Sequence, residues 1–307
     1  MSRLLSVDSG PYAPPAPARE LTAVSADGAR LHVEIHGPEA APAVVLAHGW
    51  TCSTAFWAAQ MRDLAADHRV IAYDQRGHGR SPANPACTTD ALADDLQAVL
   101  EATLAPGEQA VIAGHSLGGM TVKAASGRTV FREHAAAVLL CSTGSSRLVA
   151  ASTVVPLRPG RLRTWLTRRI LGSRAPLGPV TPLARRILKY GTMGPGSAPH
   201  MVEACARIVH ACPREVRYSW SHVLDLLDLD HGVRELDVPT AVVVGTADRL
   251  TPPVQARALA EALPHCTGLT ELPGIGHMTP VEAPELVTGK IRELVHTHIQ
   301  VVSEESA

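Results

Sequence analysis

Short, continuous apolar runs that alternate with longer amphipathic segments constrain the fold of this 307-residue chain most strongly. Apolar runs between turn residues are typical of strands buried on both faces. The stretch "LHVEIHG" at 31–37 alternates with period two and predicts a half-buried, antiparallel early strand. Together these patterns predict an α/β protein with a mostly parallel central sheet flanked by helices. The predicted buried strands are 43–49, 69–74, 109–116, 136–143, 240–248 and 268–274, and the predicted helices are 56–67, 90–104, a segment from Leu117, 253–264 and 284–298.

The alternation stops between about Gly144 and Glu235, where the sequence predicts helices separated by Pro and Gly turns. We expect this stretch to form a helical cap inserted after the sixth strand of the sheet. The predicted organisation is a flexible N-terminal segment at 1–20, a first core part at 21–143, the cap at 144–235 and a second core part at 236–307.

The stretch "VIAGHSLGGM" at 111–120 places Ser116 between glycines, directly after an apolar strand and before a helix-compatible segment. Such a turn lifts the serine Oγ out of the sheet and aims it at a pocket. Serine is a poor nucleophile at pH 7, so catalysis needs a base that takes its proton and a carboxylate that orients the base. It also needs backbone N–H donors for the oxyanion.

The rest of the chain supplies these groups at the carboxyl ends of predicted strands, where active sites of open α/β sheets gather. Asp248 follows the strand of "GTADRLTPP", and His277 lies in the loop "GIGHMTP". The segment "CSTGSS" at 141–146 has no carboxylate, which favours Asp248 as the acid. The loop at Trp50 is positioned to supply one oxyanion N–H beside that of Leu117.

In these motifs the chain resembles the α/β-hydrolase superfamily, in its serine esterase-like branch with one helical cap insertion. The resemblance covers residues from about 30 to 296 and leaves the cap unmatched. It implies that Ser116 is the nucleophile, His277 the general base and Asp248 the orienting acid, with the backbone amides of Trp50 and Leu117 forming the oxyanion hole. The motifs that carry it are "HGW" (48–50), "YDQRGHGRS" (73–81), "GHSLGG" (114–119), "GTADRLTP" (245–252) and "GIGHMTPVEAPE" (274–285).

Three other histidines near these motifs are interpreted as structural. His48 is expected to brace the oxyanion loop, with a direct catalytic role as the less favoured alternative. His78 is expected to belong to a loop whose path its glycines set, and His115 to be a packing residue within the nucleophile turn. The remaining histidines form no metal-spaced cluster and the six cysteines contain no C-x-x-C pair, so neither a metal nor another cofactor is predicted.

The cap is expected to shape the substrate pocket. Aromatic residues make up only 3% of the chain, so we expect mainly aliphatic walls and an ester with an apolar acyl group as the substrate. The indole of Trp50 either lines the acyl pocket or packs under the cap. The other candidate wall residues are Trp165, Met193, Met201, Tyr190, Tyr218 and Trp220.

The charge of the cap is uneven. Residues 135–200 contain ten Arg or Lys and no Asp or Glu. One interpretation is attraction of an anionic substrate or a membrane surface. The favoured interpretation is an ordinary cap helix at 161–171 that packs its apolar face, with Leu162, Trp165, Leu166 and Ile170, on the core and leaves its arginines in water.

The sequence therefore predicts a serine hydrolase that cleaves a carboxylic ester, or else a thioester, lactone or amide, through an acyl-enzyme. The alternatives are a perhydrolase or haloperoxidase-like enzyme, a lyase on the same scaffold, or a binding protein without activity. A net charge of −1 gives no reason to expect a nucleic-acid partner. We find no signal peptide or membrane-spanning run and therefore expect a cytoplasmic protein; its oligomeric state is left open.

Overall fold

The computed structural model describes residues 12–299, and within them eight strands form one sheet in the order β1-β2-β4-β3-β5-β6-β7-β8. The first two strands pair antiparallel, and the other six run parallel to one another. This confirms the predicted mostly parallel sheet. The strands are β1 (Arg19–Val24), β2 (Arg30–His36), β3 (Ala43–Ala47), β4 (Arg69–Tyr73), β5 (Ala110–His115), β6 (Ala135–Cys141), β7 (Thr240–Gly245) and β8 (Cys266–Leu272).

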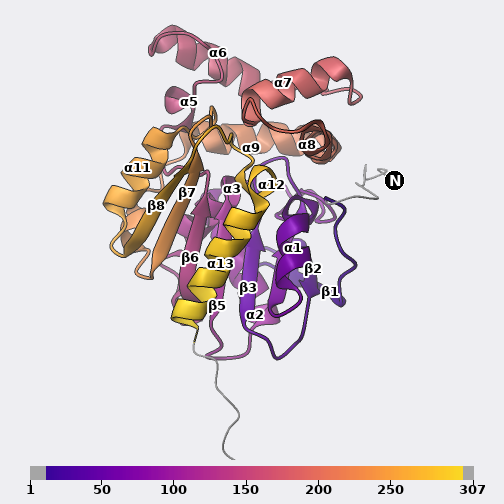
Figure 1. The fold of residues 1–307 in the computed structure, drawn as a ribbon, viewed down its shortest axis with the longest axis vertical. Helices are drawn as coiled ribbons and strands as arrows, with labels where there is room; N and C mark the ends of the chain where they lie inside the picture. Colours follow the sequence, from indigo (N-terminus) through magenta and orange to yellow (C-terminus); the bar gives the residue numbers. More distant parts are fainter. Residues whose placement is uncertain (1–11, 300–307) are drawn as a thin grey trace, which may run out of the picture.

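Helices flank both faces of the sheet, and Figure 1 shows two of them, α1 and α13, in front of it. No helix within residues 12–299 combines the length and apolar character needed to cross a bilayer. The helices outside the β6–β7 connection are η1 (Thr54–Trp57), α1 (Ala58–Leu64), α2 (Thr89–Thr103), α3 (Leu117–Ala125), α4 (Thr129–His134), α11 (Pro253–Ala262), α12 (Thr279–Glu282) and α13 (Pro284–His298).

Two apolar layers hold the helices on the sheet because successive strand residues point to opposite faces. In β3, Val44 and Leu46 join the layer that includes α1 and α13, whereas Val45 joins the layer that includes α2, α3 and α11. The strand is buried throughout, which explains its unbroken apolar sequence. The central strands from β3 to β7 are therefore closed to water on both faces, and the carboxyl edge of the sheet remains as the place for chemistry.

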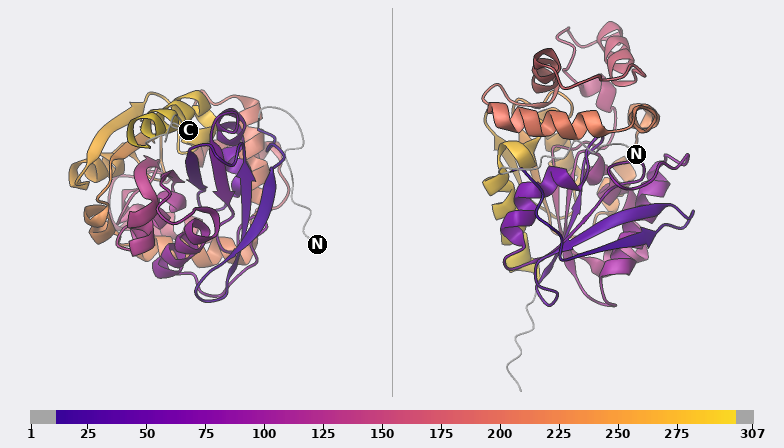
Figure 2. Two further views of the ribbon diagram at one scale, coloured as in Figure 1. Left: turned by 90° about the horizontal axis from the view of Figure 1, so that it is seen from below. Right: turned by 90° about the vertical axis from the view of Figure 1, so that its right-hand side faces the viewer.

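The connection between β6 and β7 carries only helices, and we call residues 148–235 the helical insertion. Its helices are α5 (Leu148–Ala151), α6 (Arg161–Leu171), α7 (Pro182–Thr192), α8 (Pro199–Ala211), α9 (Arg214–Leu226) and α10 (Asp230–Glu235). The helices from α5 to α9 lie over the edge of the sheet where the parallel strands end (Figure 1), as the edge-on view in Figure 2 also shows. Helix α10 instead packs against α3 and α11 in the layer on one face of the sheet.

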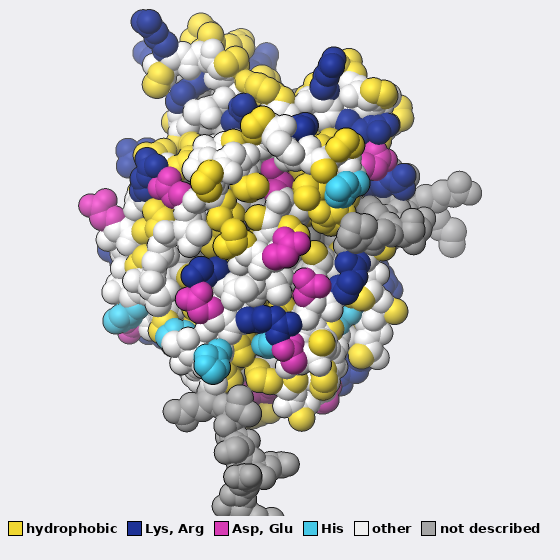
Figure 3. Space-filling model, in the orientation of Figure 1, with side chains coloured by type: hydrophobic (Ala, Val, Ile, Leu, Met, Phe, Trp, Pro, Cys, Tyr) yellow, Lys and Arg dark blue, Asp and Glu magenta, His cyan; other side chains and the backbone are white. Residues whose placement is uncertain are grey.

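Helix α6 does not pack as its sequence predicts. Leu162, Trp165 and Ile170 are 63%, 51% and 55% exposed, whereas Arg163 and Thr167 are its buried residues. Leu166 is partly buried. Most of the predicted apolar face therefore points to solvent, and a polar face points inward. Figure 3 shows hydrophobic and basic side chains gathered on the end of the molecule where α6 and α7 lie in Figure 1.

The chain is also ordered earlier than the prediction of a flexible segment at 1–20 implies. Residues 1–11 lie outside the described residues, but Tyr12 is buried and its hydroxyl donates to the Val281 carbonyl oxygen at 3.2 Å. The Tyr12 ring also stacks on His200. Strand β1, which the sequence analysis did not predict, then begins at Arg19. The buried Tyr12 ring thus holds a Pro- and Ala-rich stretch against the protein, although its composition predicts a flexible segment.

Candidate active site

Ser116 occupies the turn between β5 and α3 in a strained conformation. Its φ of 52° and ψ of −112° are rare for a residue with a side chain, and such backbone strain costs about 1–3 kcal/mol. The turn is fixed by hydrogen bonds: the Ser116 N–H donates to the Cys141 carbonyl oxygen at 3.0 Å, and the Ser116 carbonyl accepts from Thr143 Oγ1 at 2.7 Å. The positive end of the α3 dipole lies beside it.

Gly118 is required because α3 approaches β3 closely. A Cβ at this position would lie 2.0 Å from the Ala47 carbonyl oxygen, far inside contact distance. Gly119 is also constrained, since a Cβ there would lie 2.8 Å from the Thr143 side chain. The glycines of the motif therefore let the helix begin directly behind the serine.

Asp248 and His277 form a buried pair at the same edge of the sheet. His277 Nδ1 lies 2.8 Å from Asp248 Oδ2, and each residue is 3% exposed. The other carboxylate oxygen accepts the N–H groups of Leu250 and Thr251, and Thr251 Oγ1 donates to Oδ2 at 2.8 Å. Because Nδ1 donates to the carboxylate, Nε2 is left as the acceptor of the imidazole.

Two side chains whose roles the sequence analysis did not predict hold the His277 loop. The Glu282 carboxylate accepts the N–H of Gly276 at 3.2 Å and that of Met278 at 3.1 Å, on either side of the histidine. His115 Nε2 donates to the His277 carbonyl oxygen at 2.9 Å, and the two rings lie 4.9 Å apart. Since His115 directly precedes Ser116, the nucleophile turn and the histidine loop are in contact.

The loop after β3 lies against Ser116. A Cβ on Gly49 would lie 2.6 Å from His115 Nδ1 and 3.2 Å from the Ser116 Cβ, so this loop leaves no room for a side chain unless His115 shifts. His48 Nε2 accepts the Gln75 N–H at 3.0 Å, and His78 Nε2 accepts the Thr51 N–H at 3.2 Å. Burial lowers the pKa of His48 to about 3 and that of His78 to about 4, so both rings are neutral acceptors. These contacts agree with structural roles for both histidines.

Two backbone donors face no acceptor in this region. Within the part of the chain that the structure describes, the N–H groups of Trp50 and Leu117 make no hydrogen bond. One belongs to the loop that touches Ser116, and the other is the first residue of α3. Free N–H groups around a serine are what an oxyanion site requires.

Some of the predicted wall residues are buried in the core and others lie on the outside of the insertion. The prediction that Trp220 lines the substrate pocket is wrong. Trp220 is fully buried in an apolar cluster with Leu117 and Met120, and its Nε1 donates to the Arg76 carbonyl oxygen at 3.4 Å. A side chain without solvent access lines no open pocket. Trp50 is half-buried beside this cluster, and its Nε1 donates to the Arg217 carbonyl oxygen at 3.2 Å. Its indole thus packs under the insertion.

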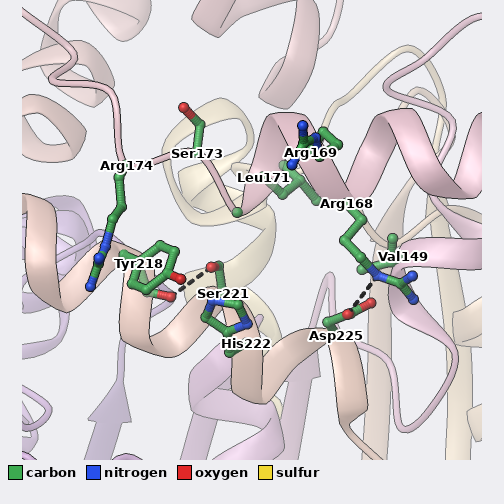
Figure 4. Close-up of a pocket in the computed structure, with 11 residues that line it drawn as sticks. Val149, Arg168, Arg169, Leu171, Ser173, Arg174, Tyr218, Ser221, His222 and Asp225 are labelled. Atoms are coloured by element: carbon green, nitrogen blue, oxygen red, sulfur yellow. Dashed lines mark hydrogen bonds and ion pairs between the residues drawn. The ribbon is translucent and has the colours of Figure 1, made fainter.

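Trp165 and Tyr190 lie on the outside of the insertion, 51% and 44% exposed, instead of lining a closed pocket. Met193 is buried in the core layer, and Met201 packs against the same layer. Tyr218 does line a cavity of about 490 Å³ between α6 and α9 (Figure 4), but neither Ser116 nor the Asp248–His277 pair belongs to its walls. Apolar periodicity identified these side chains without indicating which side of each helix meets the core.

Known proteins share this sequence pattern and architecture. The model of the alpha/beta hydrolase family matches residues 44–289. A bifunctional esterase/perhydrolase of Acinetobacter calcoaceticus is 28% identical over 272 residues, which are 85% of this chain and 94% of that protein. The 3-oxoadipate enol-lactonase 1 of Acinetobacter baylyi is 37% identical over 94 residues, so the match spans about a third of each chain (31% and 35%). The structure of a thermophilic esterase from Thermogutta terrifontis superposes with a TM-score of 0.73 at 26% identity and covers 92% of this chain and 100% of that one.

Proposed function

Since the chain belongs to the alpha/beta hydrolase family, we propose that it hydrolyses carboxylic esters through an acyl-enzyme, with Ser116 as the nucleophile. The observation that carries this proposal is the buried hydrogen bond between His277 Nδ1 and Asp248 Oδ2. The loop of His277 is in turn hydrogen-bonded to His115, the residue that directly precedes Ser116 in its strained turn. In this proposal Asp248 keeps His277 in the tautomer whose Nε2 accepts a proton.

The reaction would run in two halves. Ser116 Oγ attacks the ester carbonyl carbon while His277 takes the hydroxyl proton, and the oxyanion is stabilised by the N–H groups of Trp50 and Leu117. His277 then gives the proton to the alkoxide that leaves as the alcohol. Water attacks the acyl-enzyme and loses a proton to His277, which returns this proton to Ser116 Oγ as the carboxylic acid leaves.

We assign the helical insertion the role of a cap that borders the acyl group. A hydrogen bond between the insertion and the loop of His277 supports this assignment. The Thr192 carbonyl oxygen at the end of α7 accepts the backbone N–H of His277 at 2.8 Å. Arg249, next to Asp248, donates to the Tyr190 carbonyl oxygen at 2.9 Å. Movement of α7 would therefore reach the loops of both His277 and Asp248.

A second candidate is perhydrolysis, which the name of the bifunctional Acinetobacter relative favours. The same acyl-enzyme would react with hydrogen peroxide in place of water and release a peracid. Comparing carboxylic acid and peracid yields from one ester, with and without peroxide, separates the two outcomes.

The experiment that tests the main proposal measures hydrolysis of short and medium p-nitrophenyl esters. Ser116→Ala and His277→Ala should abolish turnover, and Asp248→Asn should lower kcat by about 10⁴-fold, as for other serine triads. Asp225→Asn, at a partly exposed carboxylate paired with Arg168, is the matched control and should retain activity.

A fluorophosphonate probe should label the wild type at Ser116 and leave the Ser116→Ala variant unlabelled. A wild-type protein that turns over no ester and whose Ser116 resists the probe would refute the proposal. Activity retained in Asp248→Asn would show that another group orients His277.

A further inference from the structure

Helix α6 turns its apolar face away from the protein. The buried Arg163 donates from Nη2 to the Ala150 carbonyl oxygen at 2.8 Å, while its Nε and the Thr167 hydroxyl are buried without hydrogen-bond partners within residues 12–299. Leu162 and Ile170 lie on the solvent side. A helix that buries polar atoms and exposes leucine gains little from this packing, so its apolar side lacks a partner.

Helix α7 repeats the pattern. None of its residues is buried, although Leu183, Ile187 and Tyr190 recur at i, i+4 and i+7 and form one stripe. These side chains are 66%, 64% and 44% exposed. Isolated surface leucines are ordinary, but apolar stripes on two helices at one end of a molecule mark an interaction surface.

The charge on this end of the molecule indicates the partner. Arg168, Arg174 and Arg185 are paired with carboxylates from later helices. Within the described part of the chain, by contrast, no carboxylate lies within ion-pair distance of the exposed Arg158, Arg161 and Arg186. The surface therefore combines apolar stripes with uncompensated positive charge.

We propose that α6 and α7 form a docking surface for bilayers that contain anionic lipids. The docking surface comprises Leu162, Trp165, Ile170, Leu183, Ile187 and Tyr190, together with Arg158, Arg161, Arg169 and Arg186. Anionic headgroups supply the missing negative charge, and the boundary of the acyl chains accepts the leucine and isoleucine side chains. Trp and Tyr are the aromatic residues that favour this boundary.

A second copy of the chain fits the same surface less well. Two such faces brought together would place unpaired arginines opposite arginines, and like charges across an interface oppose association. A lipid surface has no such conflict. Docking would also bring toward the bilayer the edge of the sheet where β5 ends, directly before Ser116 (Figure 1).

Trp165 provides a direct readout of docking. Of the four tryptophans, Trp57 and Trp220 are fully buried, Trp50 is half-buried, and Trp165 is 51% exposed. Vesicles of phosphatidylcholine with phosphatidylglycerol should shift its emission to shorter wavelength, while neutral phosphatidylcholine vesicles should not. The Ser116→Ala protein is used throughout, so that no ester is consumed and the result is independent of the proposed hydrolase activity.

Variants separate the two contributions to binding, measured by co-sedimentation with the anionic vesicles. Arg161→Gln should weaken binding about fivefold, since each basic residue near such a surface contributes about 1 kcal/mol. Leu183→Ser combined with Ile187→Ser should weaken it about tenfold or more. Arg132→Gln, at an exposed arginine of α4, and Leu286→Ser, at a 45% exposed leucine of α13, are the matched controls and should bind as before.

Three results would overturn the proposal. They are an absence of binding to the anionic vesicles, equal binding to neutral ones, and binding that the control variants weaken as much as the α6 and α7 variants do. Formation of a dimer in light scattering, lost in the Leu183→Ser and Ile187→Ser variant, would assign the surface to a second copy instead. High salt should reduce the binding because it screens the arginines.

Discussion

Lys123 on α3 donates from Nζ to Thr143 Oγ1 at 3.1 Å, entirely out of contact with solvent. The Thr143 hydroxyl in turn donates to the Ser116 carbonyl oxygen at 2.7 Å. A buried lysine therefore supports the back of the strained turn. Burial lowers the pKa of Lys123 from 10.5 to about 7, because the ammonium loses its hydration.

This pKa predicts a pH-dependent stability. Below pH 7 the lysine is protonated in both states and the folded protein carries the full penalty of a buried ammonium. Between about pH 7 and 10.5 only the unfolded chain binds the proton, so this penalty fades as the pH rises. Lys123→Met should therefore be more stable than the wild type at pH 6.5, by at most about 5 kcal/mol, and the difference should shrink toward pH 10.

Urea unfolding of both proteins across this pH range checks the prediction. Lys290→Met is the control, because Lys290 lies on the surface of α13 and pairs with Glu293. Its effect should not follow the same pH course. A Lys123→Met variant that loses stability equally at every pH would contradict a lowered lysine pKa.

The strain at Ser116 predicts that two inactive variants differ in stability. Ser116→Gly and Ser116→Ala both remove the hydroxyl, but only glycine adopts the φ of 52° without strain. The glycine variant should exceed the alanine variant by about 1 kcal/mol in free energy of unfolding, measured by urea titration. Equal stabilities would mean that the turn relaxes when the hydroxyl is absent.

The sequence revealed this turn because its requirements are local. Gly114 and Gly118 flank Ser116 within the same motif, and the backbone contacts that demand glycine leave a readable pattern. Asp248 and His277 were also predictable, since each follows a strand that ends at the same edge of the sheet. Their hydrogen bond is a consequence of that topology.

The supporting contacts were not predictable in this way. Glu282 accepts hydrogen bonds from the loop at 276–278 and from Gly194, which lies 88 residues earlier in the insertion. No local sequence pattern predicts a hydrogen-bond partner so far away in the chain. Periodicity likewise showed that Leu162 and Trp165 share a face of α6, but only the packed structure shows that this face meets solvent. Burial depends on where neighbouring elements lie, and the insertion matches no motif that would place them.

The contact of Gly118 with β3 predicts a large effect for a single methyl group. In Gly118→Ala the new Cβ would lie 2.0 Å from the Ala47 carbonyl oxygen, so α3 must shift. Overpacking of this kind costs about 1–3 kcal/mol, and it should also lower ester turnover by displacing the Leu117 N–H.

Gly191→Ala in α7 is the matched control, because a Cβ there meets nothing within 4 Å and alanine favours helix. It should be stabilising by about 0.5–1 kcal/mol with unchanged turnover. Thermal unfolding and p-nitrophenyl ester kinetics on both variants test the pair. Full activity in Gly118→Ala would disprove the requirement for close approach at this turn.

Glu282 should affect catalysis without touching substrate. Its carboxylate accepts the N–H groups of Gly276 and Met278 in the His277 loop. It also accepts the Gly194 N–H and the Ser197 hydroxyl, so it joins this loop to the insertion. Glu282→Gln replaces one acceptor oxygen by an NH₂ group that faces donors, and buried hydrogen bonds to a charged group contribute about 1.5–3 kcal/mol each. We expect a loss of about 2–4 kcal/mol in stability. We also expect a fall in kcat of up to about 10²-fold, because His277 loses its alignment.

Because Glu282 acts through His277, its effect on ester hydrolysis should fall mainly on kcat, with KM changed little. Glu282→Asp, which keeps the charge on a shorter side chain, should recover part of the turnover, whereas Glu285→Gln at an exposed position of α13 should behave as the wild type. If Glu282→Gln lowers stability but leaves kcat intact, the residue merely holds the fold. A parallel loss of kcat in Glu282→Gln and rescue by Glu282→Asp would identify the carboxylate as the group that positions the histidine.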